Sequence, residues 1–513
     1  MKVLDLAIIF GYLIGIVLFG AWFGRKQKTT RDYFLGDRSV PWWAVAFSIV
    51  ATETSTITFI SVPGIAFSRG GNYQFLQLVF GYMLGRIVIA ILFIPSYFRG
   101  ELLTVYQLLD RRFGGKIKML AASLFVVMRN IADGIRLLLT AIVLAAVYTS
   151  FQPAANAETI VVASIILIGV AMIVFTYFGG MEAVIWVEVV QLGIYIVGAL
   201  AAAIILTQSI DGGLSGALAL GSQFNKFSLF DFSFDMTKTF TFWAGLIGGC
   251  FLTMSTHGTD QYLVQRYLCT DRPRRAATAL LTSGAIVLAQ FIGFLFIGVL
   301  LFAFYHPHTD PGYATAASTA FPFTGGDRVF PDFITRHLPT GLSGLVVAAI
   351  FAAAMSSSLN SIAATSVNDL YRPFRQKLSD AHYLKVSHWL TLLWGVVQIG
   401  VALLVRNQNR SALDQALSVA SLINGPVLGV FLVGVFLKRV SEPPALIGML
   451  ASMAAMIYIR FATNIAWTWY VLIGSLITLI AAWLASFAFS AAPASRSEQL
   501  AVSPTGALEE ISE

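Results

Sequence analysis

Long apolar runs, separated by short polar gaps, cover most of this 513-residue chain. A hydrocarbon core about 30 Å thick needs roughly 20 apolar residues per helix, and thirteen runs are close to that length or exceed it. We therefore expect an all-α polytopic membrane protein with about 13 transmembrane helices. The predicted spans are approximately 4–24, 42–67, 72–98, 118–148, 158–178, 181–208, 239–263, 276–305, 336–368, 384–405, 412–436, 443–461 and 466–489.

The composition agrees with this pattern. The chain is 57% hydrophobic and 12% charged, whereas a soluble domain has about 25% charged residues, so a string of soluble domains and a disordered chain are both excluded. Its two cysteines, Cys250 and Cys269, provide neither a disulfide framework nor metal-binding spacing. We expect one transmembrane domain over residues 1–490 and a disordered cytoplasmic tail at 491–513.

Lysine and arginine gather in alternate loops, as they do in membrane proteins whose cytoplasmic loops are basic. With the N-terminus outside, most of the 33 basic residues fall in inside loops, including the clusters at 25–38, 99–118, 266–275 and 372–385. We therefore expect a plasma (cell inner) membrane protein with an outside N-terminus and a cytoplasmic C-terminus. The net charge of +7 then reports topology rather than nucleic-acid binding.

Two spans contain hydroxyl-rich, glycine-interrupted stretches, at residues 51–64 and 248–260. Membrane helices tolerate such groups where they face protein, water or a ligand. The stretches lie five spans apart, which is the pattern of discontinuous helices in two inverted repeats that bind substrate and ion near the midplane. We place the repeats at about 42–208 and 239–436. The alternative is that these hydroxyls only bond their own helix and assist packing.

Seven charged residues lie more than two residues from either end of a predicted span, where each is unfavourable by about 2.5–3.5 kcal/mol unless it has a partner or a water path. Asp133 is spaced to pair with Arg129 or with Arg136, but one carboxylate cannot neutralise both. Arg136 is therefore either a fork for a substrate carboxylate or a structural partner of Glu53 or Glu188. The seven are Arg129, Arg136 and Glu188, together with Glu53, Arg86, Asp133 and Asp260, for which we expect gating or structural roles.

The ninth span carries a serine cluster at residues 356–358, followed by Asn360 and Ser361. Hard cations prefer oxygen ligands, so hydroxyls that face carbonyls freed at the break in the second span would make an oxygen cage for Na⁺. A lone serine cluster is otherwise typical of helix packing.

Glycine pairs four residues apart predict packing seams between helices. They are Gly11/Gly15, Gly81/Gly85 and Gly425/Gly429. The sequence contains no Walker motif, HExxH, CxxC or glycine-rich dinucleotide turn. We therefore expect neither ATP-driven transport nor an enzyme.

Several short motifs, distributed over residues 4–440, together resemble those of the sodium/solute symporter family, which includes the sodium–glucose and sodium–proline cotransporters. The resemblance implies a leucine-transporter-like fold of five plus five inverted helices, with one extra helix before and two after, and alternating access driven by a sodium gradient. The motifs are Tyr33-Phe34-Leu35-Gly36, Arg111-Arg112-Phe113-Gly114, Gly179-Gly180 with Trp186 and Gln191, Asp260-Gln261-Tyr262 with Gln265-Arg266, Leu359-Asn360-Ser361 with Asp369 and Tyr371, and Gly425 to Gly429 with Lys438-Arg439.

The resemblance implies a sodium site built from carbonyls at the break of the first core helix and hydroxyls of the eighth. The first part falls on Ala51 and Thr54. The segment that would supply the hydroxyls is about three residues shorter here than in relatives. Three residues correspond to a rotation of about 300° around a helix. Alignment from upstream gives Ser356 and Ser357, whereas alignment from downstream gives alanines 353–354. We prefer the serines, because only they have hydroxyls.

The resemblance also implies a substrate pocket at Thr58, Thr253, Thr256 and His257. Small hydroxyls and a histidine at these positions weaken a sugar assignment and, with Arg136, favour an organic acid or an acidic sugar. His257 is otherwise a hydrogen-bonded structural histidine.

Glu188 lies where some relatives have an aspartate of a second sodium or proton site, so it is a cation ligand, a proton site or the partner of an arginine.

We expect a secondary active symporter that couples Na⁺ entry to uptake of a small organic solute. The alternatives are a proton-coupled or sodium-independent carrier of the same fold, using Glu188 or Glu53, and a transporter-like membrane sensor.

Overall fold

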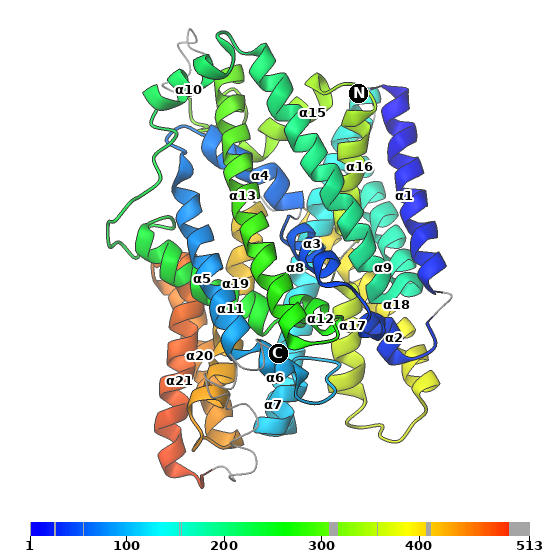
Figure 1. Ribbon diagram of the computed structural model, residues 1–513, viewed down its shortest axis with the longest axis vertical. Coiled ribbons are helices and arrows are strands. Elements are labelled where there is room, and N and C mark those ends of the chain that lie inside the picture. Colours follow the sequence, from blue (N-terminus) through cyan, green and yellow to red (C-terminus); the bar gives the residue numbers. More distant parts are fainter. Residues whose placement is uncertain are drawn as a thin grey trace.

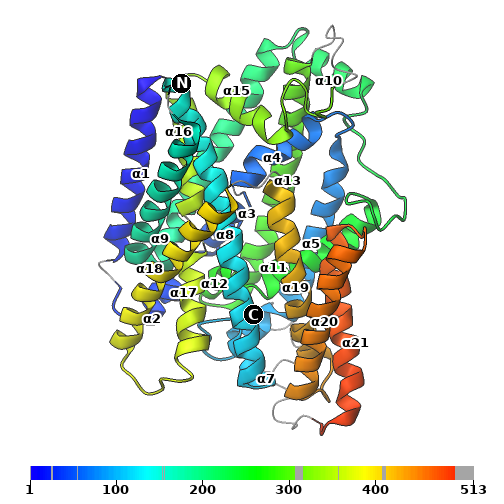
Figure 2. The ribbon, with the colours of Figure 1, turned by 180° about the vertical axis from the view of Figure 1, so that it is seen from behind.

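The computed structural model describes residues 2–24, 27–54, 56–152, 154, 156–306, 316–355, 358–406 and 412–491, and these residues form helices and loops without a strand. The long helices run mostly along one axis of the molecule (Figures 1 and 2). They are α1 (Val3–Gly24), α5 (Leu76–Leu92), α8 (Gly115–Phe151), α9 (Ala157–Ser209), α13 (Pro273–Tyr305), α18 (Asp380–Val405), α19 (Ala412–Phe436), α20 (Glu442–Ala462) and α21 (Tyr470–Ala485). Shorter helices include α2 (Thr30–Leu35), α6 (Ile94–Phe98), α7 (Gln107–Arg112), α10 (Gly213–Gln223) and α15 (Val329–His337).

Helical residues are present in every predicted span. Among the described residues, 8 helices are long and apolar enough to cross a membrane, and a ninth is the bent pair formed by the second span. The total of 13 spans stays a prediction, as do the repeat boundaries. The predicted tail lies outside the described residues from 492 onward.

The chain reverses direction inside α9, which contains two predicted spans. Its midpoint lies beside α2, since Gln27 donates to the Gly179 carbonyl at 2.6 Å, whereas its end leads to α10 at the opposite end of the bundle (Figure 1). Gly180 makes the reversal with φ 61° and ψ −169°, a conformation that is essentially restricted to glycine.

The predicted breaks in the second and seventh spans are confirmed. The second span is divided into α3 (Trp42–Glu53) and α4 (Thr56–Phe67), which are bent by 57°. The seventh is divided into η3 (Ala244–Gly248), α11 (Gly249–Gly258) and α12 (Gln261–Leu268). The Asp260 carboxylate accepts a hydrogen bond from the Tyr262 N–H at 2.9 Å and so caps α12 after the break.

The ninth span also consists of two helices, α16 (Leu342–Met355) and α17 (Leu359–Thr365). The two serines that we predict as sodium ligands, Ser356 and Ser357, fall between them and lie outside the described residues.

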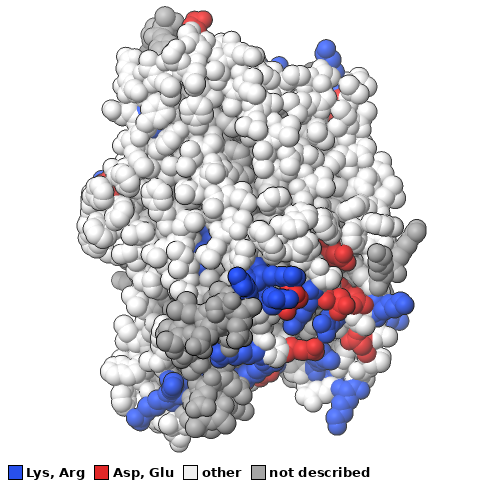
Figure 3. All heavy atoms as spheres, viewed as in Figure 1, with Lys and Arg blue, Asp and Glu red and all other residues white. Residues whose placement is uncertain are grey.

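Charged side chains gather at one end of the bundle, the lower end in Figure 3, around the region of α2 and α7 in Figure 1. The start of α1 lies at the opposite end, with α10 and α15 (Figure 1). This separation agrees with the loop charges, and the assignment of the charged end to the cytoplasm stays a prediction.

Two of the three predicted glycine seams are present. A Cβ added to Gly85 would lie 2.7 Å from the Cys250 carbonyl oxygen, so α5 packs directly on α11. A Cβ on Gly425 would lie 3.0 Å from the Cα of Gly474, so α19 packs equally closely on α21. The prediction is wrong for the α1 pair at positions 11 and 15, because a Cβ at either would meet nothing within 4 Å.

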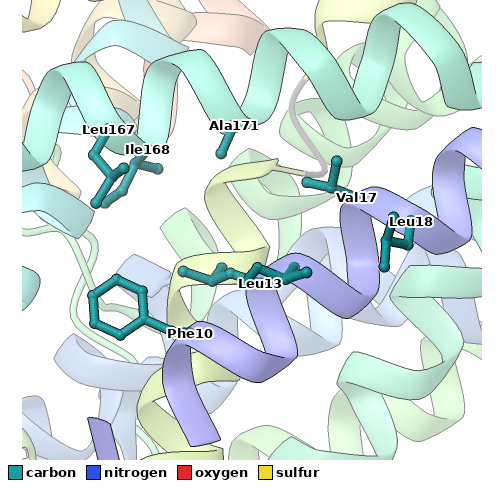
Figure 4. A pocket seen from close by; sticks show the side chains of 8 residues that line it. Phe10, Leu13, Val17, Leu18, Leu167, Ile168 and Ala171 are labelled. Carbon is teal, nitrogen blue, oxygen red and sulfur yellow. The ribbon is translucent and has the colours of Figure 1, made fainter. Parts of the chain in front are cut away.

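The helices α1 and α9 touch near Gly20, where a Cβ would lie 2.7 Å from the Phe175 ring, and leave an apolar groove further along. This groove, between residues 10–18 of α1 and 167–171 of α9, has a volume of about 240 Å³ (Figure 4). All the side chains that line it are apolar, so it suits contact with hydrocarbon rather than with a polar solute.

Lys226 caps the end of α4. Its ammonium donates to the carbonyl oxygens of Ala66 at 2.9 Å, Phe67 at 3.0 Å and Ser68 at 2.6 Å, which are acceptors that a helix end leaves without intrahelical partners. Burial lowers the pKa of Lys226 to about 8, which is still above neutral. The ammonium therefore keeps three protons for three carbonyls.

We expect Lys226→Met to lower the free energy of unfolding by roughly 1–3 kcal/mol, because three buried carbonyls lose their donor while the side-chain volume is kept. Thermal unfolding of the purified protein in detergent measures this. The control is Lys238→Met, whose side chain is 53% exposed and whose loss should have little effect. Equal stability of the two variants would contradict the capping role.

Candidate sodium and solute site

The candidate site lies where the broken helices meet the centre of the bundle. Helix α12 contacts both α3 and α17, and α8 contacts α4 and α17. Helix α9 also contacts α3 and α17. The broken helices therefore pack against α8, which carries Asp133 and Arg136, and against α9, which carries Glu188.

Glu53, the last residue of α3, forms the centre of one ion-pair network. Its Oε1 atom pairs with the fully buried guanidinium of Arg86 on α5 and with Nε2 of His257 on α11. The other ring nitrogen of His257 lies 2.8 Å from the Tyr267 hydroxyl. The network ties α3 to α5, α11 and α12, as expected for gating or structural charges. The predicted contact of His257 with solute stays a prediction.

Asp260 has a second role besides capping α12, because its Oδ2 atom pairs with Arg129 of α8. The Arg129 guanidinium also lies 4.6 Å from the centroid of the Tyr262 ring, within range of a cation–π contact. Arg129 therefore has its own carboxylate, and Asp133 does not have to neutralise it.

Glu188 is fully buried and paired with Arg266. Arg266 donates through Nη2 to Oε1 at 2.5 Å and through Nε to Oε2 at 3.3 Å. The Thr52 hydroxyl donates to Oε1 at 3.0 Å, and the Ser48 hydroxyl donates to Oε2. Of the three roles left open for Glu188, this geometry is that of an arginine partner.

The predicted position of Arg266 in a loop is wrong. The helix that follows the seventh-span break continues to Leu268, and this places Arg266 among buried residues at 0% exposure. Its charge is accommodated there because Glu188 and the Tyr262 carbonyl accept its hydrogen bonds.

Arg136 is paired with neither Glu53 nor Glu188. Its Nη1 atom lies 3.4 Å from Oδ1 of Asp133 and 3.5 Å from the Tyr262 hydroxyl, and both contacts are long. Its buried Nε has no acceptor within the part of the chain that the structure describes. One N–H of the guanidinium is therefore without a described acceptor.

Asp133 faces α17 with its other oxygen. Its Oδ2 atom accepts hydrogen bonds from the Ser358 backbone N–H at 2.9 Å and from the Ser358 hydroxyl at 2.5 Å. Ser358 is the N-cap residue of α17 and directly follows the two predicted sodium serines.

The described half of the predicted sodium site lies at the end of α3. Ala51 is buried in the last turn, and Thr54 leaves the helical conformation with φ −79° and ψ 53°. The Thr54 hydroxyl lies 2.6 Å from the Val50 carbonyl oxygen and 2.8 Å from Oε1 of Gln290, and its single proton serves one of these acceptors at a time. The predicted donor set consists of carbonyls and hydroxyls, and such oxygens suit a hard cation.

The three predicted pocket threonines lie on both broken helices. Thr58 of α4 donates to the Glu53 carbonyl at 2.8 Å, and Thr256 of α11 donates to the Leu252 carbonyl at 3.1 Å. Both are half-buried, whereas Thr253 is buried against Gly85. The structure thus places Thr253 in the seam between α11 and α5.

Sequence reasoning missed Ser48 and Thr52, which bind the Glu188 carboxylate, and Gln290 beside Thr54. The four-residue spacing of Ser48 and Thr52 places both hydroxyls on one face of α3. That spacing was a usable signal, but no local signal identified their partner on α9.

Comparisons with known proteins identify the family of the chain. A family model described as the sodium:solute symporter family matches residues 33–452. The sodium/sialic acid symporter NanT of Aliivibrio fischeri is 31% identical over 93% of this chain and 91% of that protein. SiaT of Proteus mirabilis, also a sodium/sialic acid symporter, is 30% identical over 95% and 96%. The human sodium-coupled monocarboxylate transporter 1 is 28% identical over 90% and 74%.

Solved structures support the same fold. A Na⁺-coupled sialic acid symporter in a substrate-bound outward-open state has a TM-score of 0.82 and 30% identity, covering 96% of this chain and 99% of that one. The nucleobase-cation-symport-1 transporter Mhp1 has a TM-score of 0.55 at 14% identity, a likeness of fold alone. The leucine-transporter-like fold, Na⁺ as the coupling ion and a transporter rather than an enzyme are thereby confirmed.

Proposed function

The chain belongs to the sodium:solute symporter family, and from this premise we propose that its solute is an acidic sugar of the sialic acid class. It is a multi-pass membrane protein that couples sodium entry to solute uptake by alternating access. We further propose that it works in the plasma membrane with its N-terminus outside and its charged end in the cytoplasm, since that end carries the basic loops.

The observation that carries the substrate proposal is the state of Arg136. Its guanidinium is mostly buried, its contacts with Asp133 and Tyr262 are long, and its Nε lacks an acceptor among described residues. An arginine fork matches a carboxylate with two parallel hydrogen bonds. A solute carboxylate at this position would satisfy donors that the protein leaves open.

The similar proteins favour an acidic sugar over a simple acid. The half-buried hydroxyls of Thr58 and Thr256 already donate to backbone carbonyls and can accept a hydrogen bond from either kind of solute. Two similar proteins are sodium/sialic acid symporters. A short monocarboxylate is the second candidate, because the human monocarboxylate transporter is also similar and such an acid would use the same arginine.

For the ion, we propose that Ala51, Thr54, Ser356 and Ser357 hold Na⁺ between the second and ninth spans. Binding there would favour one global state of the transporter, so that coupling is a difference in solute affinity between two states. A proton-carrying role for Glu188 has less support, because Arg266, Ser48 and Thr52 already occupy its carboxylate.

Uptake into proteoliposomes tests this function. N-acetylneuraminic acid should accumulate when an inward sodium gradient is imposed, and a pH gradient without sodium should not replace it. Pyruvate and glucose serve as comparison solutes. Accumulation of pyruvate alone would favour the monocarboxylate candidate, and uptake that ignores the sodium gradient would contradict sodium coupling at these residues.

We expect the double variant Ser356→Ala/Ser357→Ala to weaken sodium activation of uptake by about tenfold or more, because two oxygen ligands of a cation are removed. The sodium concentration that gives half-maximal uptake measures this. Ser209→Ala, which removes an exposed hydroxyl bonded to its own helix, is the control. An unchanged sodium requirement in the double variant would move the ion to other ligands.

A further inference from the structure

A polar pocket of about 300 Å³ lies among α2, the segment that joins α6 to α7, and the start of α18. We call it the charged-end pocket, because α2 lies at the charged end of the bundle (Figures 1 and 3). None of its lining residues belongs to the candidate site around Arg136, and its volume is at the lower end of the range for small-molecule sites. Its lining includes three arginines and two carboxylates, namely Arg31, Arg38, Arg372, Glu101 and Asp380.

Both carboxylates of the pocket have partners of their own. Asp380 accepts hydrogen bonds from the Thr30 N–H at 2.8 Å and from the Thr30 hydroxyl at 2.7 Å. Glu101 accepts one from Nη1 of Arg31 at 3.1 Å, and Nε of Arg31 lies 3.2 Å from the Asp37 carboxylate. The negative charge of the lining is therefore bound by Thr30 and Arg31, and the other two arginines have no share in these contacts.

Arg38 has an uncompensated charge. Its Nη2 atom donates to the Leu102 carbonyl at 3.2 Å, and its buried Nε has no acceptor among the residues that the structure describes. Burial and the neighbouring charge of Arg31 lower the pKa of Arg38, which means that the surroundings disfavour the charged form. Because an arginine in a protein stays protonated, an anion beside Arg38 would relieve this cost.

Arg372 follows η5 (Ser366–Tyr371) and is half-buried at the same pocket. Its guanidinium lies 4.6 Å from the centroid of the Tyr383 ring. A cation–π contact uses the face of a guanidinium and leaves the N–H groups at its edge available. Within the described ranges, Arg372 makes neither an ion pair nor a side-chain hydrogen bond. It therefore offers a fork of donors in a fixed plane.

We propose that the charged-end pocket binds a small oxyanion, a carboxylate or a phosphate group, with Arg38 and Arg372 as its donors. Both groups accept the paired hydrogen bonds that an arginine fork gives, and the pocket has more positive than negative charges. The inference goes beyond the proposed solute site and does not depend on Arg136, because the two sites share no residue.

Calorimetric titration of the purified protein with inorganic phosphate, in a neutral detergent at low ionic strength, tests the proposal. Arg372→Gln and Arg38→Gln should each weaken phosphate binding by about tenfold or more, because charge-assisted hydrogen bonds are lost. The matched control is Arg375→Gln, which removes an exposed arginine outside the pocket and should bind as the wild type does. Equal weakening by all three variants would show long-range attraction alone and would overturn the proposal.

Glu101→Gln should act in the opposite direction. It removes a carboxylate that competes for the pocket and releases Nη1 of Arg31, so phosphate affinity should rise by about twofold or more. The Glu101 side chain is 81% exposed, so this variant should keep the fold. Together with Arg372→Gln it decides the matter if Arg38→Gln does not fold. Phosphate affinity that stays at the wild-type value in both variants, or a wild type that binds no phosphate, would overturn the proposal.

Arg136→Lys separates this pocket from the proposed solute site. Phosphate affinity should be unchanged in that variant, and its loss there would move the anion to Arg136 and overturn the pocket. Displacement of phosphate by N-acetylneuraminic acid in Arg136→Lys would identify a solute carboxylate as the ligand. Loss of phosphate binding in nanodiscs that contain phosphatidylglycerol, but not in those of phosphatidylcholine, would instead identify a lipid headgroup.

Discussion

Replacing Glu188 by Gln lowers the free energy of unfolding by about 3–5 kcal/mol, the usual effect of removing one member of a buried ion pair. Glu188 and Arg266 are both 0% exposed, so no water replaces the lost carboxylate. The amide keeps the size of the side chain and one acceptor for Thr52, but it leaves the Arg266 charge uncompensated between α9, α3 and α12.

Thermal unfolding in detergent, followed by the loss of monodisperse protein, measures this effect. Glu158→Gln is the matched control, because it breaks an ion pair with Arg406 in which the Glu158 side chain is 69% exposed, and such pairs contribute about 0–1 kcal/mol. The double variant Glu188→Gln/Arg266→Met should recover most of the loss, because it removes both charges.

If Glu188→Gln were as stable as the wild type but required a different sodium concentration for uptake, Glu188 would be a cation ligand. A shifted pH dependence of uptake with unchanged stability would instead indicate a proton site. The three roles that the sequence leaves open for Glu188 therefore predict three different results from the stability and uptake measurements.

Replacing Arg136 by Lys weakens binding of an acidic solute by about 10–150-fold. A charge-assisted hydrogen bond contributes about 1.5–3 kcal/mol, and a lysine ammonium provides a point charge in place of a planar fork. Because the net charge is kept, the loss reports geometry rather than long-range attraction.

Calorimetric titration in saturating sodium measures the change. Arg275→Lys, on a half-exposed arginine paired with Asp271, should bind as the wild type does. An analogue in which an amide replaces the carboxylate should bind poorly to the wild type, and its affinity should differ little between the wild type and Arg136→Lys. If the two proteins showed the same ratio of acid affinity to amide affinity, the carboxylate would bind elsewhere.

The sequence was sufficient to locate the broken helices, because hydroxyl groups and glycines within an apolar run have a direct physical meaning in a membrane. It also located Glu53, Asp133, Arg136 and Glu188, since intramembrane charges are rare enough to be noticed individually. These inferences depend on local composition, which a single chain displays.

The pairing of those charges could not be predicted, because it depends on contacts between residues far apart in the chain. Arg266 lies 78 positions from Glu188, and Ser358 lies 225 positions from Asp133. The polar run that contains Arg266 resembles a loop until the helix after the break is known to be buried. The predicted packing seam at Gly11/Gly15 is wrong for a similar reason, since small residues permit a close approach of two helices but do not specify which helix lies beside them.

The reversal at Gly180 leaves no polar loop between the two limbs of α9. During synthesis, the insertion machinery has no hydrophilic segment there to keep on one side of the membrane while the first limb is integrated alone. We therefore expect the two limbs to enter the bilayer as one helical hairpin, with Glu188 on the second limb and Arg266, its eventual partner, on a helix that follows 78 positions later in the chain.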